Sequence, residues 1–158
     1  MIKTAIGQDS HRFEFENKHK KLILGGVVFE NEPPLNGNSD ADVVLHSVTN
    51  AVSGITGVNI IGEVADKMCA AGEPDSRVYL KKALEYLKGY KINHVSVSIE
   101  CKRPKITPKI EEMRESIAGI LGIEKGDVGV TATSGEGLTE FGKGNGVQVL
   151  SIVTVEGK

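Results

Sequence analysis

The chain has 158 residues, of which 39% are apolar and 25% charged, with a formal net charge of −2. This length and composition indicate one soluble domain over residues 1–158 and exclude a fibrous or disordered chain. The slight negative charge and the 4% of aromatic residues argue against a nucleic-acid-binding surface. The only two cysteines, Cys69 and Cys101, are too few for a disulfide framework, so we expect a reducing, cytoplasmic location. No signal-peptide pattern or membrane-length apolar run is found, and we expect no membrane role.

The first quarter of the chain is predicted to hold two strands and a loop. Residues 2–7 and 22–29 are expected to be extended, the second with the sequence LILGGVVF. The Pro, Asn and Gly residues of NEPPLNGNSDAD predict a loop over residues 31–42. Glycine makes up 19 of the 158 residues, which is well above the usual ~7% and indicates tight turns and close backbone approaches.

A helix is predicted directly after this loop. Its apolar face is marked by Val44, Val48, Ala51, Val52 and Ile55. Ser39 and Asp42 have the spacing of a capping box at its start, and Gly57 suits its end. Residues 58–74 show no clear period and are expected to form a loop.

The second half is predicted to contain two further helices and three strands. A helix is expected over about 75–88, and HVSVSIEC, residues 94–101, alternates strictly as a half-buried strand does. Thr107 and Pro108 suit the start of a third helix. The final strands are expected at about 127–133 and 146–155.

This order of elements predicts an α+β fold, a mixed β-sheet with helices on one face. The last strand, VQVLSIVTV, is apolar on both faces. Because helices cover only one side of such a sheet, the other side is expected to pack against another subunit.

The segment IGQDSHRF, residues 6–13, contains an acid and a histidine two positions apart. In an extended chain Asp9 and His11 point to the same face. Such a pair can hold a metal ion or form a plain hydrogen bond. His46 would complete a three-ligand site with one position open, the pattern of catalytic zinc, although it can equally be a buried core histidine. Asp42, four residues earlier on the same helix face, is a candidate to orient His46.

Seven segments of the chain follow one another as they do in a known family. They are IGQDSHRF, LILGG, SDADVVLH, DSR, RPKITPKIEEMR, TATSGE and GKGNG. In order and spacing they resemble the 2-C-methyl-D-erythritol 2,4-cyclodiphosphate synthases of the non-mevalonate isoprenoid pathway. The resemblance covers about residues 4–155.

The resemblance implies a homotrimer with sheets around a central axis and active sites between subunits. Each site is expected to hold Zn²⁺ and a second ion, Mg²⁺ or Mn²⁺. The implied reaction is a phosphorus–oxygen lyase step, in which 4-diphosphocytidyl-2-C-methyl-D-erythritol 2-phosphate cyclises to the 2,4-cyclodiphosphate and releases CMP. The axial cavity of the family can take an isoprenoid diphosphate.

The resemblance also implies a role for individual residues. The zinc ligands match Asp9, His11 and His46, and the ligand of the second metal matches Glu136. On the catalytic side, next to the phosphates, stand Ser134 and Asn38. Substrate contacts match Ser39, Asp66, Thr133, the segment Pro104, Lys105, Ile106 and Thr107 around the cytosine, and Lys143 at the trimer axis.

The chain departs from the family pattern on the nucleotide side. Asn38 replaces a histidine beside the phosphates, and Ile60 stands where an acid would bind the ribose hydroxyls. These departures, and the altered segment 58–74, keep two alternatives open. One is a non-catalytic trimeric module that binds an isoprenoid diphosphate or a nucleotide. The other is a metal-dependent enzyme that acts on a different diphosphate ester.

Overall fold

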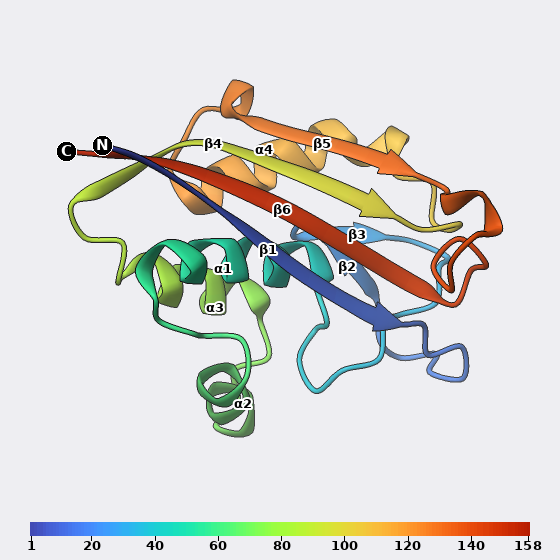
Figure 1. Ribbon diagram of the computed structural model, residues 1–158. Coiled ribbons are helices and arrows are strands. Elements are labelled where there is room, and N and C mark those ends of the chain that lie inside the picture. The colour runs from blue at the N-terminus through green and yellow to red at the C-terminus, as the bar shows by residue number, and fades with distance from the viewer.

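A four-stranded mixed sheet forms one layer of the protein, and the computed structural model describes all of residues 1–158 (Figure 1). The strands lie in the order β1-β6-β4-β5. Their bounds are β1 Ile2–Arg12, β4 Tyr90–Glu100, β5 Val128–Thr133 and β6 Gly146–Gly157. Only β4 and β5 pair in parallel, while β6 runs antiparallel to both of its neighbours. The expected mixed sheet is confirmed, and β1 and β4 extend well beyond the ranges predicted for them.

The segment predicted as one strand over residues 22–29 is a hairpin, so that prediction was wrong. Strands β2, Leu22–Leu24, and β3, Val27–Phe29, pair antiparallel with Leu24 opposite Val27. The two residues between them, Gly25 and Gly26, both have positive φ, 64° and 77°. A two-residue turn with positive φ at both positions suits hairpin twist, and glycine adopts it without steric cost.

Four helices cover one face of the sheet or lie beyond it (Figure 1). Their bounds are α1 Val43–Thr56, α2 Glu63–Ala70, α3 Ser76–Leu84 and α4 Ile110–Leu121. Helix α1 packs against β1 and β6, α4 packs against β5, and α3 lies against α1. The expected end of α1 is confirmed, since Gly57 has φ 76° there. None of the helices is both long and apolar enough to cross a lipid bilayer.

Helix α2 lies where the sequence predicted a loop over residues 58–74. It projects below the other helices and buries only Ala65 (Figure 1). Glu63 and Asp66 lie in its first turn, where negative charge is favourable, and Lys67 pairs with Glu63 at 2.8 Å. A helix with one buried residue leaves no apolar period in the sequence, which explains the wrong prediction.

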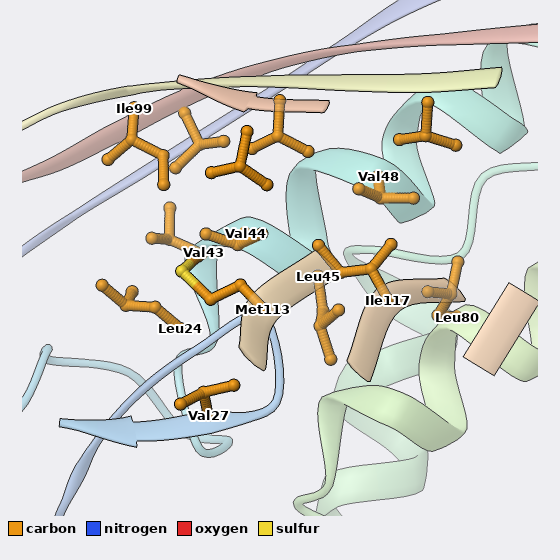
Figure 2. Packing of buried hydrophobic residues seen from close by; sticks show 14 of the residues in the cluster. Leu24, Val27, Val43, Val44, Leu45, Val48, Leu80, Ile99, Met113 and Ile117 are labelled. Atoms are coloured by element: carbon orange, nitrogen blue, oxygen red, sulfur yellow. The ribbon is translucent and has the colours of Figure 1, made fainter. Parts of the chain in front are cut away.

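The core lies between the inner face of the sheet and the helices (Figure 2). Figure 2 shows Ile99 of the sheet above Val43 and Val44 of α1 and Met113 of α4. Val95, Val97, Ile99 and Cys101 are all buried, which confirms the alternation predicted for residues 94–101. The helices therefore hold a fixed position against the strands that carry the candidate ligands.

The opposite face of the sheet carries exposed apolar side chains. Ile6 is 64% exposed, Ile152 44% and Leu150 39%. Ile6 lies directly opposite Ile152 across β1 and β6, so these side chains form one surface. The second apolar face predicted for the last strand is therefore present and is not covered within one chain.

Asp42, and not Ser39, caps the start of α1. Its carboxylate accepts hydrogen bonds from the backbone N–H groups of Leu45 at 3.0 Å, Gly25 at 2.8 Å and Gly26 at 2.7 Å. It therefore joins the helix to the β2–β3 turn. Burial raises the pKa of Asp42 to about 6, even though these three N–H groups favour its ionised form.

Gly7 allows β1 to lie directly on the backbone of α1. A Cβ atom at this position would lie 2.1 Å from the carbonyl oxygen of Ser47 and 2.3 Å from the backbone nitrogen of Ala51. No side chain fits into this space. Strand and helix can meet here only because residue 7 is glycine.

Replacing Gly7 by alanine should destabilise the protein by about 3 kcal/mol or more, because the added methyl group must push the strand off the helix. Gly119→Ala is the matched control, since nothing lies within 4 Å of a Cβ at this exposed position in α4. That change should stabilise by about 0.5–1 kcal/mol through the better helix propensity of alanine. Urea unfolding at one protein concentration measures both changes, and equal effects would contradict the close approach.

Protonation of Asp42 should make wild type more stable at lower pH, relative to Asp42→Asn. The pKa of this residue is about 6 in the folded chain and near 3.8 unfolded, so the folded state binds the extra proton between these values. The unfolding free energy of the wild type, minus that of Asp42→Asn, should therefore rise by roughly 2–3 kcal/mol as pH falls from 7 to 4. Chemical unfolding of the metal-free proteins tests this, and a difference that does not change with pH would refute it.

Candidate metal centre

Asp9, His11 and His46 come together at one point of the structure. Asp9 and His11 project from the helix-facing side of β1, and His46 projects from the first turns of α1. Their ligand atoms all lie within 4.8 Å of one another. The strand and the helix meet as the metal-site hypothesis requires.

The spacing of the three ligand atoms suits a tetrahedral metal ion. Oδ2 of Asp9 lies 3.1 Å from Nε2 of His11 and 3.1 Å from Nδ1 of His46. Ligands about 2.0–2.1 Å from a tetrahedral zinc ion are separated by roughly 3.3 Å. One carboxylate and two imidazoles form a donor set that zinc accepts readily.

The electrostatics of the group favour a charged carboxylate. Burial alone would raise the pKa of Asp9, but its hydrogen bonds with His11 and His46 outweigh burial and lower that pKa to about 2. The hydrogen bond to Asp9 raises the pKa of His11. Asp9 is therefore ionised over the physiological range, which is the state that binds a cation.

His46 is also held from its other side, while the backbone of Asn36 contributes to the raised pKa of His11. Nε2 of His46 lies 2.7 Å from Oγ of Ser76, the first residue of α3. Outer partners of this kind orient metal-binding histidines.

The prediction that Asp42 orients His46 was wrong. Both oxygens of Asp42 accept backbone N–H groups and do not contact the His46 ring. Ser76, for which the sequence predicted no role, contacts the ring instead. Ser76 lies 30 residues from His46, and only tertiary structure brings the two together.

A cavity of about 320 Å³ opens beside the three ligands. Asn38, Ser39 and Asp66 line it, as does Cys69, whose thiol donates a hydrogen bond to the carbonyl oxygen of Asn38 at 3.1 Å. Asn38, predicted on the catalytic side, and Ser39 and Asp66, predicted as substrate contacts, thus share one pocket with the candidate ligands. Asp66 reaches it from α2, the helix that the sequence analysis did not predict.

The remaining predicted residues lie elsewhere in the same chain. Thr133, Ser134 and Glu136 follow β5, the segment 104–107 follows β4, and Lys143 precedes β6. None of them lines the cavity beside the ligands. Strands β6 and β4 separate β1 from β5, so the two edges of the sheet are about 14 Å apart. One chain therefore does not bring all the predicted site residues together.

The turn after β5 is held in an unusual backbone conformation. The hydroxyl of Thr133 accepts the N–H of Gly135 and that of Ser134 accepts the N–H of Glu136, both at 3.3 Å. Glu136 has φ 53°, a value uncommon for residues other than glycine. Its carboxylate projects into solvent from this tight turn.

The nucleotide-side residues differ in their exposure. Pro104 and Ile106 are buried, while Lys105 and Thr107 are exposed. Lys143 is also exposed and pairs with Glu140 at 3.3 Å. Ile60 is only 1% exposed and belongs to the hydrophobic core, so its side chain does not face the cavity.

Known proteins resemble this chain in sequence and in fold. A model of the YgbB family matches residues 2–156. The 2-C-methyl-D-erythritol 2,4-cyclodiphosphate synthase of Chlamydia caviae is 51% identical over 98% of this chain and 89% of that protein. Among solved structures, IspF of Plasmodium falciparum, in complex with CDP, matches with a TM-score of 0.85 at 26% identity, over 99% of this chain and 97% of that one.

The bifunctional IspDF of Campylobacter jejuni has the same fold over part of its length. It matches with a TM-score of 0.89 at 28% identity over 100% of this chain, which spans 43% of that longer chain. The resemblance seen in the sequence motifs is thus confirmed over nearly the full chain. The chain belongs to the YgbB family, together with the cyclodiphosphate synthase that it resembles.

Proposed function

We propose that the protein converts 4-diphosphocytidyl-2-C-methyl-D-erythritol 2-phosphate to 2-C-methyl-D-erythritol 2,4-cyclodiphosphate and releases CMP. The observation that carries the proposal is the convergence of Asp9, His11 and His46 beside a cavity, in a chain 51% identical to the Chlamydia caviae synthase. The relative in complex with CDP supports a cytidine diphosphate substrate. As a metabolic enzyme without a membrane-spanning helix, it is expected to work in the cytoplasm.

The reaction forms one phosphorus–oxygen bond and breaks another. An oxygen of the 2-phosphate attacks the β-phosphorus of the cytidyl diphosphate, and the bond from that phosphorus to the bridging oxygen breaks. CMP leaves with the bridging oxygen as the ring closes. Attacker and leaving group belong to one substrate, so the main task of the protein is to hold them in line.

The proposed metal ligands are divided between the two edges of the sheet. Asp9, His11 and His46 would hold Zn²⁺, and Glu136 would contribute to a site for Mg²⁺ or Mn²⁺. When bound, these cations neutralise the crowded phosphate oxygens. The donor chemistry fits, since imidazole with carboxylate suits zinc, and a single exposed carboxylate beside phosphate oxygens suits magnesium.

The cavity residues would orient the methylerythritol and phosphate end of the substrate. The Ser39 hydroxyl and the Asn38 amide can donate hydrogen bonds to phosphate oxygens, and the Asp66 carboxylate can accept them from the sugar-alcohol hydroxyls. Asn38 cannot carry charge or transfer a proton, so we assign it a hydrogen-bonding role only.

The other residues would act from a neighbouring chain. The hydroxyls of Thr133 and Ser134 would contact the phosphates, and the segment 104–107 would enclose the cytosine. The distance between the sheet edges within one chain and the exposed apolar surface of Ile6, Leu150 and Ile152 support a homotrimer. Lys143 would lie near its axis, where a cavity for an isoprenoid diphosphate is expected.

Release of CMP should require the three proposed zinc ligands. The wild type, given the diphosphocytidyl substrate with Zn²⁺ and Mg²⁺, should release CMP, and His46→Ala should release it at least about 100-fold more slowly. His94→Ala is the matched control, because His94 lies on β4, outside the metal centre, and is exposed. Chromatographic quantification of CMP measures all three proteins.

Two results would count against the synthase reaction. A wild type that binds zinc and the nucleotide but releases no CMP would favour the non-catalytic binding module. Turnover of a different diphosphate ester, without turnover of the cytidyl compound, would favour the related enzyme.

A charge on the open face of the sheet should prevent assembly. Ile152→Asp should shift the sedimentation equilibrium from three chains of 16.9 kDa to one, because a buried carboxylate in an apolar interface is costly. Tyr86→Asp is the control, since Tyr86 has the same 44% exposure and follows helix α3. Assembly unchanged by Ile152→Asp would contradict the proposed packing of the sheets.

A further inference from the structure

Ser76 has a side chain with only two partners, and one of them is a candidate metal ligand. It is the first residue of α3 and is 0% exposed. Its hydroxyl lies 2.7 Å from Nε2 of His46 and also donates to the carboxylate of Asp40. The cap of α3 is supplied by Asp75, whose side chain accepts the N–H of Arg77 at 2.9 Å. The Ser76 hydroxyl is therefore free of any capping role.

Asp40 determines the direction of the Ser76 hydroxyl. The Asp40 carboxylate also accepts the backbone N–H groups of Ser76 and Asp42, each at 3.1 Å. A carboxylate only accepts hydrogen bonds, so the Ser76 hydroxyl proton points to Asp40. The oxygen of Ser76 then presents a lone pair to His46, and Nε2 of His46 must be the donor.

In the metal-bound state, the direction of this hydrogen bond fixes the proton of the His46 ring on Nε2. A neutral imidazole with its proton on Nε2 has its free lone pair on Nδ1. Nδ1 is the atom that lies 3.1 Å from Oδ2 of Asp9, on the side of the ligand group. A ring with its proton on Nδ1 would have its lone pair on Nε2, which faces Ser76 and not the ligand group.

We propose that Ser76 is a positioning residue that holds His46 with its proton on Nε2 and its Nδ1 lone pair toward the metal. Asp40 fixes the hydroxyl of Ser76, and Ser76 fixes the ring. The inference rests on the proposed zinc site, and it assigns a function to a residue that contacts no substrate or metal itself.

The test measures zinc affinity by competition with a chromophoric chelator, for the full chain without substrate. Ser76→Ala should bind zinc 10–100-fold more weakly, the range typical for loss of an outer partner. Ser76→Thr, which keeps the hydroxyl, should restore most of the affinity. Thr49→Val is the matched control, because Thr49 is also fully buried and its hydroxyl contacts only the Leu45 carbonyl oxygen within α1. Its affinity should equal that of the wild type.

The wild type alone supplies a second readout. Long-range ¹H–¹⁵N NMR distinguishes the protonated nitrogen in each ring, and the chain has only four histidines. In the zinc-loaded protein, the Nε2 proton of His46 should give a resolved signal that exchanges slowly with water, because the buried Ser76 oxygen accepts it. This measurement tests the Ser76 contact even where Ser76→Ala fails to fold.

The outcomes distinguish an error in the role of Ser76 from an error in the proposed zinc site. If the wild type binds zinc and folded Ser76→Ala binds it equally well, or if the Nε2 proton of His46 exchanges with water as freely as that of an exposed ring, the role of Ser76 is wrong and the zinc site stands. If the wild type binds no zinc, the proposed metal site is wrong and the role of Ser76 falls with it.

Discussion

The metal centre depends on the close approach of β1 to α1 at Gly7. The two backbones meet there without an intervening side chain, and the contact involves Ser47, the neighbour of His46. Two and four residues further along β1, Asp9 and His11 therefore point at the first turns of the helix. A Cβ at position 7 would lie 2.1 Å from the Ser47 carbonyl oxygen, so a larger residue would have to push the strand away by about 1 Å or more, which is enough to disturb the spacing of the ligand atoms. Packing geometry thus comes first, and the chemistry of the site follows from it.

Buried polar groups reinforce this contact at several points. The Asp42 carboxylate joins α1 to the β2–β3 turn, the hydroxyls of Ser47 and Ser151 meet between helix and sheet at 2.7 Å, and Ser76 joins α3 to His46. A buried donor or acceptor without a partner costs about 1–3 kcal/mol, so each of these links favours one arrangement of the elements. The only buried side-chain oxygen without a partner is Oγ of Ser53, at the far end of α1 from the site.

The sequence was informative where the physical signal is local. Strict alternation predicted the strand around Val97, and the Asp9–His11 spacing placed two ligands on one face of a strand. It was uninformative where a role depends on tertiary contact. Helix α2 buries a single residue, and the acceptor chosen for His46 was its neighbour Asp42 instead of Ser76 from another helix. The cavity could likewise not be predicted, since it forms only when α2 brings Asp66 toward the ligands.

We propose that Asp9, His11 and His46 together hold one zinc ion. Diffraction from crystals of the zinc-loaded protein, recorded on both sides of the zinc absorption edge, tests it directly. We expect one anomalous peak per chain, within about 2.0–2.2 Å of Oδ2 of Asp9, Nε2 of His11 and Nδ1 of His46. A zinc peak elsewhere, or none between these three side chains, would contradict it.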